Sequence, residues 1–148
     1  MFHLFHPAFV HFSIAFLIFG ALTEAVGLLA RLERTSRFGE LLVLLGTASL
    51  LPTLATGYVA ANSLSFSPEA LELLSLHEST GWSVLGVFVV LLVWKAWNRG
   101  RLEGAQRWVY AIALIVGALL AGYGGIIGGR MVYREAVGVT VAVGRLLR

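Results

Sequence analysis

Hydrophobic and polar positions follow one another in long blocks along this chain. Four long apolar stretches are separated by short polar segments. A helix needs about 20 apolar residues to cross the hydrocarbon core of a bilayer, and each stretch is long enough for one such crossing. The predicted spans are residues 7–30, 39–61, 77–97 and 108–129. The pattern therefore predicts an all-α fold, a four-helix transmembrane bundle.

Local signals mark where two of these helices begin. Pro7 suits the first turn of a helix, where the hydrogen bond that it cannot donate is not needed. Ser67, Pro68 and Glu69 form a typical helix start, and residues 69–76 either lie at the membrane interface or lead into the third span. The tail of residues 130–148 is too short to cross again. We therefore expect residues 1–148 to form a single membrane domain with this tail outside the bundle.

Composition supports a membrane protein and excludes several other classes. The chain is 58% apolar and only 13% charged, with a net charge of +3. Its basic residues flank the apolar stretches, so the charge does not indicate nucleic-acid binding. The absence of cysteine excludes disulfides, thiolate catalysis and iron–sulfur ligation. Aspartate is also absent, and Asn, Gln and Met are scarce, which favours a thermophilic source.

Charged loops predict the orientation. The segments after the first and third spans carry seven basic residues, whereas the segment after the second span carries none. Cytoplasmic loops are enriched in Lys and Arg, so both termini and the histidines are expected on the outer side of the membrane. The seven residues are Arg31, Arg34, Arg37, Lys95, Arg99, Arg101 and Arg107.

Two histidines are predicted at the same depth near the outer ends of different spans. His11 lies twenty residues before Arg31, and His77 lies eighteen before Lys95. At ~1.5 Å of rise per residue, their levels agree within about one helical turn. An ionisable side chain inside a span is a functional candidate because burying it is costly. Contact with lipid headgroups is the plainer alternative, and it suits His3 best.

Glycines share the predicted layer of these histidines. A b-type haem takes two axial histidines, and its flat ring needs close backbone approach, which glycine permits. Spacings of four residues between small residues are also typical of plain helix packing or dimerisation. The glycines are Gly57, Gly81, Gly124 and Gly128.

We therefore predict a b-type haem held by His11 and His77 between the first and third helices. His6 lies one to two turns outside His11 and would bond a propionate or act as the alternative ligand. Arg130 and Tyr133 are placed at the same side to pair with the propionates. The predicted function is electron transfer near the outer face of the membrane.

The alternative is a non-redox structural subunit, or a zinc or copper site built from His6, His11 and His77. His6 and His11 are five residues apart, whereas a separation of three or four puts two ligands on one helix face. The sequence presents no carboxylate cluster of a hydrolytic site and no Ser/His/acid triad. An electron-transfer role is therefore favoured over an enzyme with its own substrate.

The opening motif His6-Pro7-x-x-Val10-His11-Phe12 resembles that of a family of bacterial membrane proteins called domain of unknown function 2231. The resemblance extends to His77 and to later segments. Ser13 stands where family members usually carry Pro, and Glu135-Ala136 stands where many carry His-Gly, so no ligand is assigned there. The later segments are Thr56-Gly57 and Gly128-Gly129-x-x-Val132-Tyr133-Arg134.

This resemblance implies a bacterial cytoplasmic membrane, and the loop charges then predict the histidines on its periplasmic side. The family's four-helix architecture is similar to that of the two-haem membrane cytochromes b. Some relatives are fused to Rieske-type domains, which implies a redox partner such as a Rieske-type protein or a cytochrome c. The chain lacks a second histidine pair at the cytoplasmic layer, so a two-haem path across the membrane is not expected. The expected partner is the lipid bilayer, with association into a homo-oligomer as a further alternative.

Overall fold

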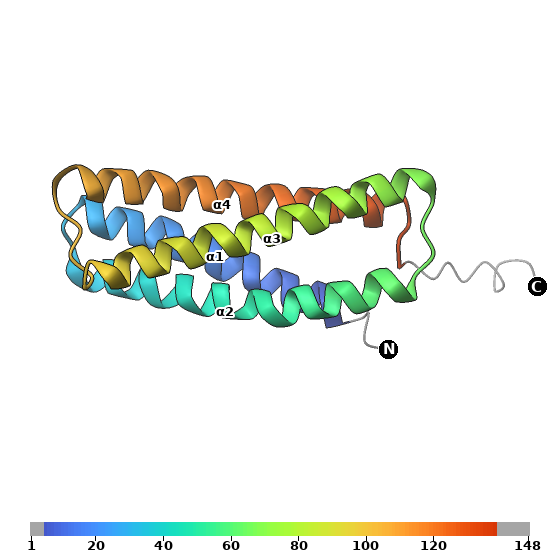
Figure 1. The fold of residues 1–148 in the computed structure, drawn as a ribbon, viewed down its shortest axis with the longest axis horizontal. Coiled ribbons are helices and arrows are strands. Elements are labelled where there is room, and N and C mark those ends of the chain that lie inside the picture. The colour runs from blue at the N-terminus through green and yellow to red at the C-terminus, as the bar shows by residue number, and fades with distance from the viewer. Residues whose placement is uncertain (1–4, 139–148) are drawn as a thin grey trace, which may run out of the picture.

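The computed structural model describes residues 5–138 and contains four helices, with no strand within that range. The helices are α1 (Phe5–Leu29), α2 (Glu33–Ser63), α3 (Pro68–Trp97) and α4 (Gly104–Tyr133). They run up and down in sequence order, joined by short loops (Figure 1). The predicted all-α four-helix architecture is confirmed.

The helices pack in a ring, so that α1 and α3 occupy opposite corners of the bundle. Within the described residues α1 contacts α2 and α4, and α3 contacts α4 and α2, with the α2–α3 contact the smallest. Figure 1 shows α4 and α2 along opposite edges, with α3 passing in front of α1. Side chains that point inward from α1 and α3 therefore meet across the bundle axis.

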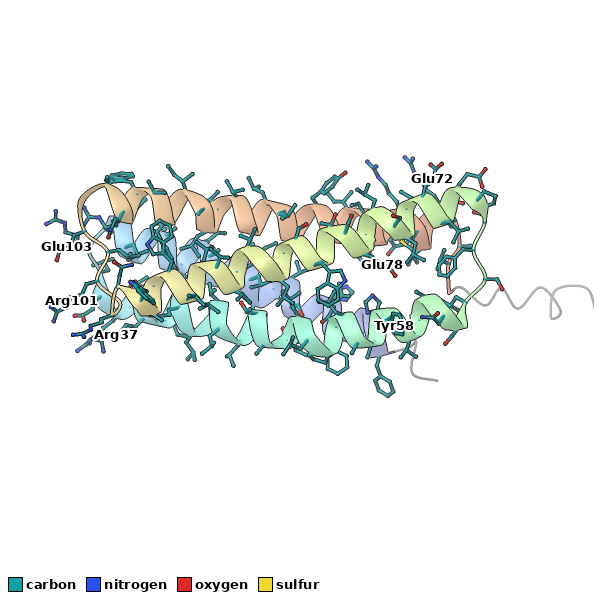
Figure 2. The ribbon with its side chains drawn as sticks, in the orientation of Figure 1. Arg37, Tyr58, Glu72, Glu78, Arg101 and Glu103 are labelled. Atoms are coloured by element: carbon teal, nitrogen blue, oxygen red, sulfur yellow. The ribbon has the colours of Figure 1, made fainter. Side chains whose placement is uncertain are left out.

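The outer surface is apolar along the helices and charged at their ends. All four helices are long and apolar enough to cross a membrane. Large apolar side chains such as Phe19, Val90 and Leu119 are exposed on the outside, as expected of a lipid-facing surface. In Figure 2 the labelled Arg37 and Arg101 lie at the end opposite to Glu72 and Glu78.

Two names are used below for the ends of the bundle. The arginine end holds the α1–α2 and α3–α4 loops, residues 30–32 and 98–103. The histidine end holds the α2–α3 loop, residues 64–67, together with the start of α1 and the end of α4.

The helices extend beyond the predicted apolar spans. α3 begins at Pro68 because the Ser67 hydroxyl accepts a hydrogen bond from the Ala70 N–H at 3.1 Å, as an N-cap does. Residues 70–76 therefore lead directly into the third span. A helix of 31 residues such as α2 is about 45 Å long, which exceeds a hydrocarbon core of about 30 Å. The helix ends thus project into the headgroup layers.

The closest helix contact lies between α1 and α2, where glycines bring the two backbones together. A Cβ atom added at Gly39 would lie 2.2 Å from the Glu24 nitrogen, and one at Gly27 would lie 2.3 Å from the Ser36 nitrogen. Gly20 and Gly46 continue the same contact toward the histidine end. Small residues allow such approach in membrane helices, where packing rather than apolar burial drives association.

Candidate functional site

Two histidine side chains meet across the bundle axis at the histidine end. The ring centroids of His6 on α1 and His77 on α3 are 6.3 Å apart, and the ring planes are nearly perpendicular at 89°. Both side chains are half-buried. Their helices occupy opposite corners of the bundle, so each ring points inward from its own side.

The His6 ring is held by α2. Its Nδ1 lies 3.0 Å from the carbonyl oxygen of Thr53 and 3.3 Å from the Thr56 hydroxyl oxygen. A carbonyl oxygen only accepts, so Nδ1 carries the proton and Nε2 keeps a free lone pair. The ring edge lies against Gly57, where an added Cβ would be 2.9 Å from His6 Cε1.

The His77 ring is held by α4 in the same manner. Its Nδ1 lies 3.1 Å from the carbonyl oxygen of Gly124, which again leaves Nε2 as a free acceptor. A Cβ added at Gly128 would be 3.2 Å from His77 Cε1. An Nδ1–H bond to a backbone carbonyl is the support that metal-bound histidines usually have. Neither Nε2 has a hydrogen-bond partner among residues 5–138.

The two halves of this site repeat each other. Each histidine donates to the carbonyl of a residue 47 positions later and lies against the glycine four positions beyond that. An offset of 71 residues carries His6 to His77 and Gly57 to Gly128. The α1–α2 and α3–α4 hairpins thus hold their histidines by equivalent contacts.

A cavity of about 400 Å³ opens beside the two rings. Its lining is mainly apolar and comes from all four helices. This volume falls in the range of about 300–1,000 Å³ that is typical of sites for small molecules and cofactors. The labelled Tyr58 and Glu78 belong to the lining and lie at the histidine end in Figure 2. All four predicted glycines line it: Gly57, Gly81, Gly124 and Gly128.

The fold and this site can be compared with known proteins. A family model described as a predicted membrane protein, DUF2231, matches residues 3–141. The chain belongs to the DUF2231 family. No curated protein and no solved structure matches the chain. The family description agrees with the four spanning helices and names no activity.

Within this DUF2231 chain, His11 does not take the place that the sequence predicted. Its side chain is exposed, its Nδ1 bonds to the carbonyl oxygen of Pro7, and it does not line the cavity. A separation of five residues turns His11 about 140° around α1 from His6, so only one of them can face the axis. The structure therefore brings His6, and not His11, to His77.

The expected cluster of three histidines is consequently not formed. Within residues 5–138 there is no group of three or more His, Cys, Asp or Glu side chains placed to hold one metal ion. His3 lies outside the described residues. The protein donors available at the site are two imidazole nitrogens.

Arg130 and Tyr133, predicted as partners of a propionate, lie at the same end of the bundle but on its outside. Both are exposed, Tyr133 by 90%, and neither lines the cavity. Both residues lie near the end of α4, at the histidine end of the bundle as predicted. Their side chains, however, point away from the bundle axis and not toward the cavity.

A polar ladder, which is a row of hydrogen-bonded hydroxyl groups of Ser13, Ser49 and Thr53, lies next to His6 and was not predicted from the sequence. The Ser13 hydroxyl on α1 lies 2.8 Å from the Thr53 hydroxyl and 2.9 Å from the Ser49 hydroxyl, both on α2. Ser13 is almost completely buried. The ladder ties α1 to the residue whose carbonyl holds His6. The signal available in the sequence is the run of Ser and Thr at spacings of three and four residues in the second span.

A second buried polar group lies toward the arginine end. Lys95 Nζ is 2.6 Å from Glu24 Oε1 and 3.0 Å from Glu40 Oε2, and the Lys95 and Glu24 side chains are buried. The same offset of 71 residues relates Glu24 to Lys95. Tyr110 lies beside Glu24, and its hydroxyl oxygen is buried.

Proposed function

We propose that this DUF2231 protein binds a b-type haem between His6 and His77 and transfers electrons at the histidine end. The observation that carries the proposal is the facing pair of imidazoles, each with Nδ1 bound to a backbone carbonyl and Nε2 free. This ligand pair replaces the pair of His11 and His77 that the sequence predicted.

The spacing of the rings fits one metal ion between them. Metal–imidazole bonds are about 2.0–2.1 Å long, and a ring centroid lies about 1.1 Å behind its nitrogen, so two axial rings have centroids roughly 6.2–6.4 Å apart. The centroids of His6 and His77 are 6.3 Å apart. The separation of the two rings thus matches that of two imidazole ligands on one metal ion.

The number of protein donors favours haem over a structural zinc site. A structural zinc site takes four protein ligands and a catalytic one takes three, whereas this site presents two. A porphyrin supplies four equatorial nitrogens and needs two axial ligands from the protein. A porphyrin also has two equivalent faces, which suits the equivalent contacts of His6 with Gly57 and of His77 with Gly128.

The residues of the chain would set the properties of the bound group, which supplies one-electron redox chemistry. The carbonyls of Thr53 and Gly124 hold each ring in one orientation, and accepting the Nδ1–H bond raises the basicity of Nε2. The glycines of the cavity leave space for a flat ring against the helices. Arg130 and Tyr133 could reach propionates at the surface by changing side-chain rotamers.

The test is the haem content of the purified protein and of three histidine variants. His6→Ala and His77→Ala each remove one axial ligand and should lose the low-spin spectrum or most of the haem, while His11→Ala should keep both. His11 is the matched control because it is also a histidine of α1, lies little more than one turn from His6 and is exposed. Normal haem in His6→Ala together with loss in His11→Ala would reverse the assignment.

A second candidate is the binding of a copper(I) ion by the same two imidazoles. The same ring spacing favours it, since copper accepts imidazole ligands and a two-coordinate site needs no third donor. Elemental analysis of the purified protein separates the two cases. Copper at one equivalent, with no Soret band, supports this candidate and contradicts the haem proposal.

The loop charges indicate the side of the membrane on which the proposed electron exchange takes place. The positive-inside rule puts the arginine end in the cytoplasm of a bacterial cell and the histidine end on the periplasmic side. A redox partner on that side, such as a cytochrome c or a Rieske-type protein, could then exchange electrons with a haem near the surface.

A further inference from the structure

A second cavity, of about 740 Å³, lies at the arginine end. It is open to the outside and is lined by the last turns of α1 and α3, the first turns of α2 and α4, and the loops between them. Figure 2 shows Arg37, Arg101 and Glu103 gathered at this end. Six basic and three acidic side chains line the cavity, so its walls carry an excess of positive charge.

Internal ion pairs account for only part of this charge. Arg37 pairs with Glu33 at 2.6 Å, and buried Lys95 pairs with Glu24 and Glu40. The other lining arginines form no ion pair within residues 5–138, and Glu103 is the one lining carboxylate left to oppose them. These arginines are Arg31, Arg99, Arg101 and Arg107.

The guanidinium group of Arg107 contains a hydrogen-bond donor without an acceptor in the described part of the chain. This donor is the Nε atom, which is buried. A buried polar atom without a partner is unfavourable and is uncommon in native structures. A guanidinium group fits an oxyanion with two parallel hydrogen bonds, which would satisfy this nitrogen.

Two of these arginines hold a backbone conformation that arginine rarely adopts. Arg31, two residues after α1, has φ of 59°, and Arg99, two residues after α3, has φ of 53°. Glycine or asparagine usually fills such a position after a helix, because a Cβ is disfavoured at positive φ. Both strained residues line the cavity. Strain of this kind tends to occur where a side chain is needed for function.

We propose that this cavity binds a phosphate-bearing anion. The arginines would pair with phosphate oxygens, with Arg107 at the inner wall and Arg31 and Arg99 at the two helix ends. The helix ends reach the headgroup layer, where basic pockets between transmembrane helices bind anionic lipid headgroups. The phosphate thus belongs to a lipid phosphodiester or to a soluble compound. The site is separate from the histidines and does not depend on haem.

The simpler explanation is that these charges only orient the protein in the membrane. Arg34 separates the two explanations, because it lies in the same charged segment but is exposed and does not line the cavity. Arg34→Gln and Arg107→Gln change the net charge equally. Both arginines contribute equally to membrane orientation, which depends on the number of basic residues in the loops. Only the loss of Arg107, which lines the cavity, should weaken anion binding at a specific site.

The experiment measures thermal unfolding of the full-length, detergent-purified protein. Phosphatidylglycerol, phosphatidylcholine and inorganic pyrophosphate are titrated separately. We expect phosphatidylglycerol or pyrophosphate to raise the unfolding temperature and phosphatidylcholine to leave it unchanged. Arg107→Gln should weaken the apparent affinity about tenfold or more, as expected for losing a charge-assisted hydrogen bond, and Arg34→Gln should not. A response to pyrophosphate alone identifies a soluble ligand, and a response to phosphatidylglycerol alone identifies a lipid.

A second variant keeps the test decisive if Arg107→Gln folds poorly. Arg99→Gly removes a cavity charge and relieves the positive-φ strain, so the protein without ligand should be at least as stable as the unmodified one. Its stabilisation by the anion should nevertheless be smaller. Equal responses of Arg99→Gly, Arg34→Gln and the unmodified protein, or no response to either phosphate compound, would overturn the proposal.

Discussion

At the scale of single residues, the direction in which a side chain points from its helix decides which histidine belongs to the site. Counting rise per residue put His11 at the level of His77, whereas the ring that meets His77 in the structure is that of His6, five residues earlier on α1. The sequence could not say which of His6 and His11 faces the axis, since that depends on how α1 packs on α2. Glycine contacts set this packing, and they turn His6 toward Thr53 and His77.

Two glycines next to the histidine rings provide a residue-scale prediction. Gly57→Ala and Gly128→Ala would place a Cβ atom 2.9 Å and 3.2 Å from His6 and His77, respectively. Each methyl group should push its ring away and reduce haem content without removing a ligand. Haem per protein, measured after purification, checks this expectation. Gly129→Ala is the control because nothing lies within 4 Å of its added Cβ; an equal loss in all three variants would contradict the role of ring contact.

The buried charges provide a second residue-scale prediction. Lys95→Met leaves the buried Glu24 carboxylate without its partner at 2.6 Å, so we expect a loss of about 3–5 kcal/mol in unfolding free energy. Arg37→Gln breaks an exposed ion pair and should cost less than about 1 kcal/mol. Unfolding in SDS reports both values. The double variant of Glu24→Gln with Lys95→Met should lose less than Lys95→Met alone; a larger loss would argue against this pairing.

At the scale of elements, the sequence predicted four helices but underestimated their length. Hydropathy windows end where polar residues begin, although a helix continues through the headgroup layer when its end is capped. Ser67 provides such a cap, and it extends α3 nine residues before His77. His77 therefore lies inside a helix rather than at its mouth. The helix–helix contacts depend on three-dimensional complementarity, which a single sequence does not reveal.

The contact between α1 and α2 provides a prediction at this scale. Gly39→Ala would place a Cβ atom 2.2 Å from the backbone nitrogen of Glu24, so the helices must separate. Overpacking of this kind costs about 1–3 kcal/mol, and more where backbone must move. Gly86→Ala is the control because its Cβ meets nothing within 4 Å, and removing a helical glycine should add about 0.5–1 kcal/mol. Unchanged stability of Gly39→Ala would contradict the close contact.

At the scale of the whole molecule, the bundle consists of two hairpins whose histidine contacts recur at an offset of 71 residues, although α1 packs on α2 more extensively than α3 packs on α4. The offset of 71 residues is present in the sequence, where it joins His6 to His77, Gly46 to Gly117 and Gly57 to Gly128. Few positions are identical because the equivalent contacts use backbone carbonyls, as at Thr53 and Gly124, which constrain no side chain. The repeat is therefore easier to recognise in the structure than in the sequence.

The orientation of the whole bundle is open to direct measurement because the chain contains no cysteine. Single cysteines at Ser65, in the α2–α3 loop, and at Arg34, near the start of α2, report on opposite ends. The loop charges predict that Ser65→Cys reacts with a membrane-impermeant maleimide in intact cells and that Arg34→Cys reacts only after the membrane is opened. The reverse pattern would place the histidine end in the cytoplasm.

The measurement that most directly tests the account is the absorption spectrum of the purified protein, recorded after air oxidation and again after reduction with dithionite. Two imidazoles that face each other with free Nε2 atoms predict a Soret band that shifts on reduction, together with resolved α and β bands of a low-spin haem. A protein purified from haem-replete cells that shows no Soret band in either state would contradict the central claim.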